Sequence, residues 1–224
     1  SEPALFRISM SGFNQSIYSR THRGGDVEVV KNNMRRLAEA AMRVDTSTEI
    51  EVFYHRYLGN SDDELLTRQY CDELGFSFRP TWAYLMPIEK MLQYIDEPSQ
   101  LSEQDMDVVN LLALPPDERV IKASLALRNQ GCSLMEDQIT LTSQGIVQLC
   151  CAVFDEQEHS LCSYLERPLH EIQEMKKGKS ICVRCMSHGI QNLVVYKSHQ
   201  YDEIAKARLL DHYRDLVNAE QPTF

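Results

Sequence analysis

Four cysteines in the second half of the chain form two pairs whose spacing suits a shared metal centre. Cys132 and Cys150 flank Gly145 in a Cys-x12-Gly-x4-Cys pattern, and Cys182 and Cys185 form a Cys-Val-Arg-Cys pair. Thiolates bind zinc and iron-sulfur clusters, and a C-x2-C pair places two of them on one turn of the chain. We therefore expect these four residues to surround either an iron-sulfur cluster or a structural zinc ion.

The other three cysteines receive different interpretations. Cys151 directly follows Cys150 and faces the opposite side of a strand, so we expect it to pack in the interior. Cys162 is an alternative ligand by its spacing, whereas Cys71 lies in a helical pattern that predicts a core position. Seven cysteines that include a C-x2-C pair suit a reducing compartment better than a disulfide framework.

Composition and charge exclude some classes of function. The chain has 224 residues, 43% of them hydrophobic, and a formal net charge of -10 at pH 7. This charge repels phosphates, so we expect no nucleic-acid partner. No apolar run is long enough to span a bilayer, and the initial Ser-Glu-Pro-Ala lacks signal-peptide features, so we expect a cytoplasmic protein without a membrane partner.

The first half of the chain alternates predicted strands with predicted helices. Strands are expected at residues 5–10, 49–57 and 76–86, and helices at 27–41 after an Asp26 cap, at 62–74 before Gly75, and at 88–94. This alternation predicts a parallel α/β sheet, whose strands carry ligand sites at their carboxyl ends. Ser9 and Ser11 lie at such an end.

The second half predicts a smaller α+β unit around the cysteines. The expected elements are a β-hairpin of residues 139–141 and 146–152 with Cys150 late in its second strand, a helix from Pro168 to Lys177 stopped by Gly178, and a final helix at 201–217. Cys182 and Cys185 fall on the turn between the two helices.

Together the two halves resemble one known arrangement. Residues 8–12 (ISMSG), Tyr18 and residues 22–26 (HRGGD) are similar to the middle of the barrel in a radical S-adenosylmethionine (SAM) enzyme. The spacing of the four cysteines, with the run CCAVFD at 150–155, resembles the auxiliary-cluster module called twitch or, in its longer form, SPASM. The resemblance covers nearly the whole chain.

The resemblance implies a fold in four parts. These are a partial parallel (β/α) barrel in residues 1–95, a helical bridge in 96–130, a small cysteine-rich α+β domain of β-hairpin plus helix in 131–196, and a C-terminal helix in 197–224. The family's C-x3-C-x2-C motif, which holds the SAM-cleaving cluster, is absent from this sequence, and no cysteine follows Cys185. The chain thus resembles the C-terminal half of such an enzyme, beginning near the fourth strand, and we expect it not to cleave SAM by itself.

The resemblance also assigns roles to residues. Ser9 and Ser11 belong to the SAM pocket, and Arg23, with Arg20 as the alternative, pairs with the SAM carboxylate through its guanidinium fork. Asn60, which follows the next strand, is a candidate for the same cavity. One auxiliary [4Fe-4S] cluster is implied on Cys132, Cys150, Cys182 and Cys185.

The implied function is radical-based modification, by oxidation, epimerisation or cross-linking, of a peptide or small-molecule substrate in an oxidoreductase or maturase. The implied partners are that substrate, an electron donor and the missing N-terminal barrel half, supplied by the same protein, a second chain or a second copy. Two alternatives stay open: a non-catalytic α/β binding module with a structural zinc site on the four cysteines, and a thiol redox protein using Cys182 and Cys185. The second of these lacks the aromatic or proline context expected beside its motif.

Overall fold

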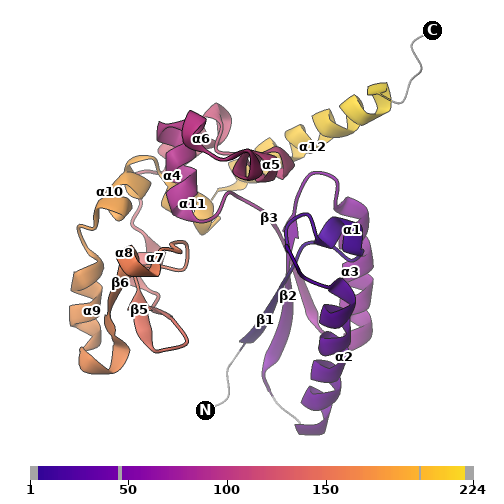
Figure 1. Ribbon diagram of the computed structural model, residues 1–224, viewed down its shortest axis with the longest axis horizontal. Helices are drawn as coiled ribbons and strands as arrows, with labels where there is room; N and C mark the ends of the chain where they lie inside the picture. The colour runs from indigo at the N-terminus through magenta and orange to yellow at the C-terminus, as the bar shows by residue number, and fades with distance from the viewer. Residues whose placement is uncertain (1–4, 45–46, 197, 220–224) are drawn as a thin grey trace. The chain divides into compact units, whose positions relative to one another are not determined.

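The computed structural model describes residues 5–44, 47–196 and 198–219. The chain divides into two compact units, which we describe separately (Figure 1). The first unit comprises Ser1–Ala83, Leu111–Ala113 and His212–Phe224, and the second comprises Tyr84–Asn110 and Leu114–Asp211. Most of the segment expected to form a helical bridge thus groups with the cysteine-bearing unit.

The first unit is built on a three-stranded parallel sheet in the order β1-β2-β3. Its strands are β1 (Leu5–Met10), β2 (Glu49–Arg56) and β3 (Ser77–Trp82). Ser9 pairs with Phe53, and Phe53 pairs with Arg79. The parallel α/β sheet is confirmed, but in the described residues β1 and β3 are both edge strands, so no barrel closes there.

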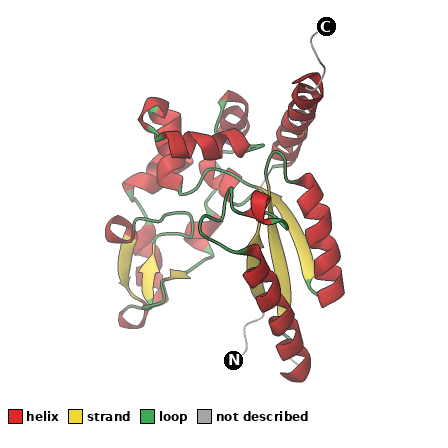
Figure 2. Ribbon diagram, turned by 45° about the vertical axis from the view of Figure 1, so that its right-hand side comes forward, coloured by secondary structure: helices red, strands yellow, loops and turns green. Residues whose placement is uncertain are grey.

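Helices cover one face of this sheet (Figure 2). The helices are α1 (Gln15–Tyr18), α2 (Val27–Val44) and α3 (Ser61–Leu74). Buried Met10, Val52 and Tyr54 pack with helix side chains that include Met34 and Cys71. Because strand side chains alternate between faces, the opposite face carries a mainly polar set, Arg7, Ser9, Glu51, Phe53, His55, Arg79 and Thr81.

The helix boundaries of this unit follow local sequence signals. Asp26 Oδ1 accepts hydrogen bonds from the backbone N–H groups of Glu28 (2.8 Å) and Val29 (3.3 Å), as the predicted cap requires. Gly75 ends α3 with a φ of 69°, in the left-handed region that glycine enters without steric penalty. Both predicted signals are confirmed.

The remainder of the chain is mostly helical with a small antiparallel sheet. Its helices are α4 (Ile88–Asp96), η1 (Pro98–Gln100), α5 (Glu103–Leu111), α6 (Glu118–Leu125), α7 (Ser133–Glu136), α8 (Glu156–His159), η2 (Tyr164–Glu166), α9 (Leu169–Lys176), α10 (Ser180–Ser187), α11 (Ile190–Val194) and α12 (His199–Ala219). The sheet has the order β4-β5-β6, with β4 (Thr140–Leu141), β5 (Ile146–Gln148) and β6 (Ser160–Ser163). No helix in the described residues combines the length and apolar character needed to cross a membrane.

Two predictions for this region are corrected by the structure. The hairpin is part of a three-stranded sheet, and its second strand ends at Gln148, so Cys150 lies beyond the strand rather than late in it. Beyond the strand, the Leu149 N–H still donates to the His159 carbonyl next to β6, and the Ala152 carbonyl accepts from the Ile88 N–H at the start of α4. Cys182 and Cys185 lie within helix α10 and not on a free turn.

Candidate metal centre

Four cysteines from three separate segments line one cavity. Cys132, Cys150, Cys182 and Cys185 surround a space of about 30 Å³ in the second unit. The rest of the lining consists of aliphatic and methionine side chains and one amide, that of Gln191. The structure therefore brings together the four residues that spacing alone singled out.

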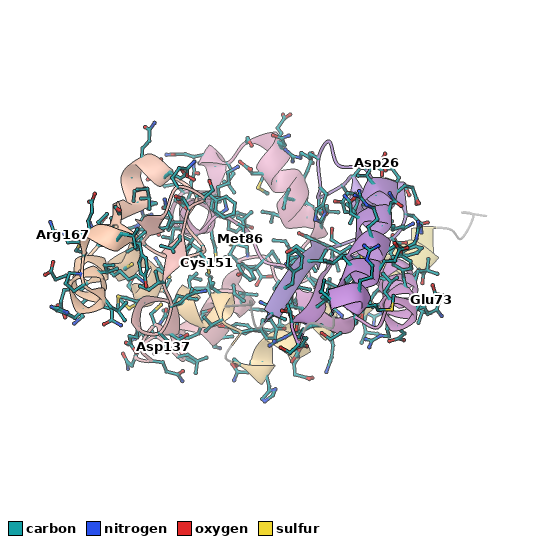
Figure 3. All side chains as sticks on the ribbon, turned by 90° about the horizontal axis from the view of Figure 1, so that it is seen from below. Asp26, Glu73, Met86, Asp137, Cys151 and Arg167 are labelled. Atoms are coloured by element: carbon teal, nitrogen blue, oxygen red, sulfur yellow. The ribbon has the colours of Figure 1, made fainter. Side chains whose placement is uncertain are left out.

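The remaining three cysteines lie outside this lining. Cys71 is fully buried on α3, which confirms the core prediction. Cys151, which is labelled in Figure 3, is exposed, so the prediction that it packs in the interior is wrong. The strand alternation that motivated it does not apply, because the chain has already left β5. Cys162 lies on β6, paired with Val147.

The segment that carries Cys150 is held against helix α4. The Ile88 N–H donates to the Ala152 carbonyl at 2.8 Å, and the Glu89 carboxylate accepts from the Phe154 N–H at 2.9 Å. Glu89 lies in the first turn of α4, and its carboxylate thereby satisfies backbone donors of the loop that follows Cys150. These contacts fix the path of the chain immediately after the cysteine.

Backbone hydrogen bonds lower the pKa of two of the four cysteines. Burial raises the pKa of Cys150, and backbone hydrogen bonds from Ala152 and Val153 oppose that rise. Burial likewise raises the pKa of Cys185, and a backbone hydrogen bond from Gln191 opposes it. A hydrogen bond donated to a cysteine sulfur stabilises the thiolate form. In iron-sulfur proteins, hydrogen bonds to the sulfurs are one of the factors that set the reduction potential of the cluster.

Helix α10 presents the C-x2-C pair to the cavity. Cys182 and Cys185 are three residues apart in this helix, a separation that places side chains on the same helix face. Burial raises the pKa of Cys182 to about 11, with Cys150 and Cys132 adding to the rise. Without a bound metal these thiols are therefore protonated at neutral pH, and metal binding must displace their protons.

The corner between α10 and α11 is fixed by close packing on α6. Gly189 has a φ of 72°, and a Cβ added there would lie 2.0 Å from the Ser124 carbonyl oxygen. The Asn192 side-chain nitrogen donates to the Leu127 carbonyl at 2.9 Å. This corner sets the direction in which α10 presents Cys185.

The four thiols line a cavity of about 30 Å³ in which the part of the chain that the structure describes shows no close group of ligands. Among the described residues, no three histidine, cysteine, aspartate or glutamate side chains converge closely enough to hold a metal ion. A zinc ion needs its sulfur ligands at about 2.3 Å from one point. In a four-iron cluster each thiolate binds a different iron, so the sulfurs lie farther apart. Four thiols are the donor set that either an iron-sulfur cluster or a zinc ion takes.

A second, smaller cavity lies at the carboxyl edge of the parallel sheet. Ser11, Arg20 and Asn60 line this space of about 10 Å³, together with residues that include Tyr57. Ser9 and Arg23 are exposed and lie outside its lining. The structure thus brings together three of the five residues predicted for a SAM pocket.

A hydrogen-bonded cluster behind this cavity was not anticipated from the sequence. Ser11 Oγ lies 2.9 Å from His22 Nδ1 and also bonds Thr21, and the His22 ring stacks on Tyr18 with 4.3 Å between centroids. Burial lowers the pKa of His22. Burial and the nearby His22 lower the pKa of His55 to about 4. These histidines lack ligand spacing in the sequence, and only the sheet topology brings them together.

The chain has no significant match among protein-family models, curated proteins or solved structures. The family resemblance therefore rests on the cysteine spacing and the short motifs of this sequence. The geometry of the two cavities is independent of that resemblance, because it comes from the fold of this chain alone.

Proposed function

We propose that this chain is the C-terminal portion of a radical SAM enzyme and carries an auxiliary [4Fe-4S] cluster on Cys132, Cys150, Cys182 and Cys185. One observation carries the proposal: four thiols that come from three segments of the sequence line a single, otherwise mainly apolar cavity. A bound cluster supplies one-electron redox chemistry at this position. The proposed reaction is radical-based oxidation, epimerisation or cross-linking of a peptide or small-molecule substrate.

The residues of this chain hold and insulate the centre. Aliphatic and methionine side chains exclude water from the cavity, which strengthens electrostatic interactions inside it. The backbone donors at Cys150 and Cys185 stabilise two of the thiolates. Helix α4 and the Gly189 corner keep the cysteine-bearing segments in register with each other.

The sheet contributes a share of the SAM pocket in this proposal. Ligands of parallel α/β sheets bind at the carboxyl ends of the strands, where Ser11, Arg20 and Asn60 line the smaller cavity. Arg20 offers the guanidinium that a carboxylate such as that of SAM requires. The exposed edge of β1 is the place where further barrel strands, from the same protein, a second chain or a second copy, pair with this sheet.

The alternative functions are less well supported by the geometry. A structural zinc module uses the same four cysteines, but among the described residues no three candidate ligands lie close enough to hold a single metal ion. A thiol redox protein needs a thiolate at neutral pH, whereas burial raises the pKa of both Cys182 and Cys185. The metal content of the protein decides between zinc and iron.

Cysteine variants of the full chain test the assignment of ligands. After anaerobic reconstitution with iron and sulfide, Cys132→Ala and Cys185→Ala should each lose the cluster, measured as bound iron and as absorbance of the sulfur-to-iron bands. Cys151→Ser is the matched control, because Cys151 neighbours a ligand yet is exposed and lies outside the cavity. Full iron retention in either alanine variant, or loss in the control, contradicts the assignment.

A further inference from the structure

A fully buried lysine lies on helix α9 beside the cysteine cavity. The side chain of Lys176 has 0% exposure. Its ammonium donates to the backbone carbonyls of Leu134, at 3.4 Å, and of Gln138. Both acceptors are neutral, and within the described side chains no carboxylate forms an ion pair with Lys176.

A buried ammonium without a counter-charge is unfavourable. Lysine is almost never fully buried unless it is paired, because removing its charge from water is unfavourable. The carbonyls of Leu134 and Gln138 satisfy hydrogen-bond donors but bring no negative charge. We therefore expect a negatively charged group to lie close to the Lys176 ammonium.

Lys176 lies against the wall of the cysteine cavity, because Leu134, whose carbonyl accepts its hydrogen bond, lines that cavity together with the four cysteines. Burial lowers the pKa of Lys176, while Cys150, Cys132 and Cys182 raise it. In the reverse direction, Lys176 lowers the pKa of Cys182. Cysteine sulfurs that have lost their protons to a bound metal centre would supply the counter-charge that this ammonium lacks.

The position of Lys176 also explains how the Cys132 segment is held. Leu134 and Gln138 belong to the segment that follows Cys132 and includes α7, and the Gln173 side chain on the same helix donates to the Glu136 carbonyl at 3.2 Å. A neutral donor would serve that purpose as well. Holding the loop therefore explains why a hydrogen-bond donor lies at this position, but it does not explain why the donor is positively charged.

We propose that Lys176 is a positioning residue whose buried positive charge stabilises the reduced state of the centre held by the four cysteines, and so raises its midpoint potential. The inference rests on the proposed function. One electron passes from a one-electron donor to the centre, which gains one negative charge; the donor is the substrate radical in the proposed enzyme and a reduced mediator dye in the test. Lys176 gains and loses neither electron nor proton, and no bond to it forms or breaks.

Three variants separate charge from hydrogen bonding. Lys176→Gln retains an N–H donor for the two carbonyls but removes the charge, and Lys176→Arg retains the charge. Lys177→Gln is the matched control: it removes the same charge from the next position, where the side chain is exposed and pairs with Glu174 at 2.5 Å.

The measurement is the midpoint potential of the full chain after anaerobic reconstitution, from a mediated redox titration followed by electron paramagnetic resonance, with iron counted for each variant. Lys176→Gln should keep its iron and shift to a more negative potential, while Lys176→Arg and Lys177→Gln stay close to the unmodified chain. Loss of iron in Lys176→Gln alone, with Lys176→Arg loaded, would overturn the proposed effect on the potential and show instead that the charge is needed to hold the centre.

Other outcomes overturn the inference in distinguishable ways. If Lys176→Gln holds its iron at an unchanged potential, Lys176 does not tune the centre, although the cluster assignment stands. If both Lys176 variants lose iron while the unmodified chain binds it, the residue acts through packing and not through charge. If the unmodified chain binds no iron, the proposed function fails first and this inference fails with it.

Discussion

The side-chain nitrogen of Asn60 donates a hydrogen bond to the backbone carbonyl oxygen of Ser11 at 2.8 Å. The same nitrogen donates to the His55 carbonyl at 3.0 Å, and Asn60 Oδ1 accepts from the Tyr57 N–H at 2.9 Å. One buried amide therefore ties together the chain segments that leave β1 and β2. Both of its N–H donors are used, so Asn60 shapes the smaller cavity by holding its walls in place.

Replacing this amide should destabilise the first unit. Asn60→Ala removes three hydrogen bonds and leaves buried backbone groups without partners, which predicts a loss of about 3 kcal/mol in the free energy of unfolding. Urea unfolding measures the change. Asn33→Ala on the exposed side of α2 is the control and should change stability by less than about 0.5 kcal/mol. Equal effects for the two variants would contradict a linking role for Asn60.

Two glycines with the same backbone conformation should respond differently to alanine. Gly189 and Gly178 both have a φ of 72°, but a Cβ at Gly189 meets the Ser124 carbonyl oxygen at 2.0 Å, whereas a Cβ at Gly178 meets nothing within 4 Å. Gly178→Ala should cost about 1 kcal/mol from backbone strain alone. Gly189→Ala should cost roughly 3 kcal/mol or more, because backbone must move. Similar melting temperatures for the two variants would show that the α10–α11 corner is not tightly packed.

The half-buried histidine on β2, His55, predicts a loss of stability in mild acid. The pKa of His55 is about 4 in the folded chain, against about 6.5 when unfolded. Between these values the unfolded state binds more protons, so stability is present above pH 6.5 and falls as the pH falls toward 4.

The effect of His55 can be isolated by mutation. From pH 7 to pH 5 its contribution to the free energy of unfolding should fall by about 2 kcal/mol, and His55→Gln should flatten the pH dependence by that amount. His170→Gln, at an exposed position, should leave the slope unchanged. Parallel pH profiles for the unmodified chain and His55→Gln, from urea unfolding at each pH, would rule out this role.

The elements that could be predicted from the sequence are those with local signals. The strand at Leu5–Met10, the Asp26 cap and the Gly75 stop all appear as expected, because alternation, capping and left-handed glycine act within a few residues. Strand β6 (Ser160–Ser163) was missed, because its four residues carry little pattern and form a strand through pairing with β5.

The residues of the candidate site also fall into those that the sequence identified and those that it could not identify. The spacing of the cysteines identified the four that line the cavity, since ligand pairs of metal centres recur at characteristic separations. Lys176 and the backbone donors at Ala152, Val153 and Gln191 could not be found in this way. Their proximity to the thiols depends on how α9, α10 and the loop after β5 pack together, which no local pattern in the sequence records.

The most direct test of the central claim is the iron, sulfide and zinc content of the full chain after anaerobic purification. The proposal predicts about four irons with matching sulfide per chain and little zinc, as expected for one cluster on four thiolates. About one zinc per chain and no iron would contradict it, and the four cysteines would then form a structural zinc site.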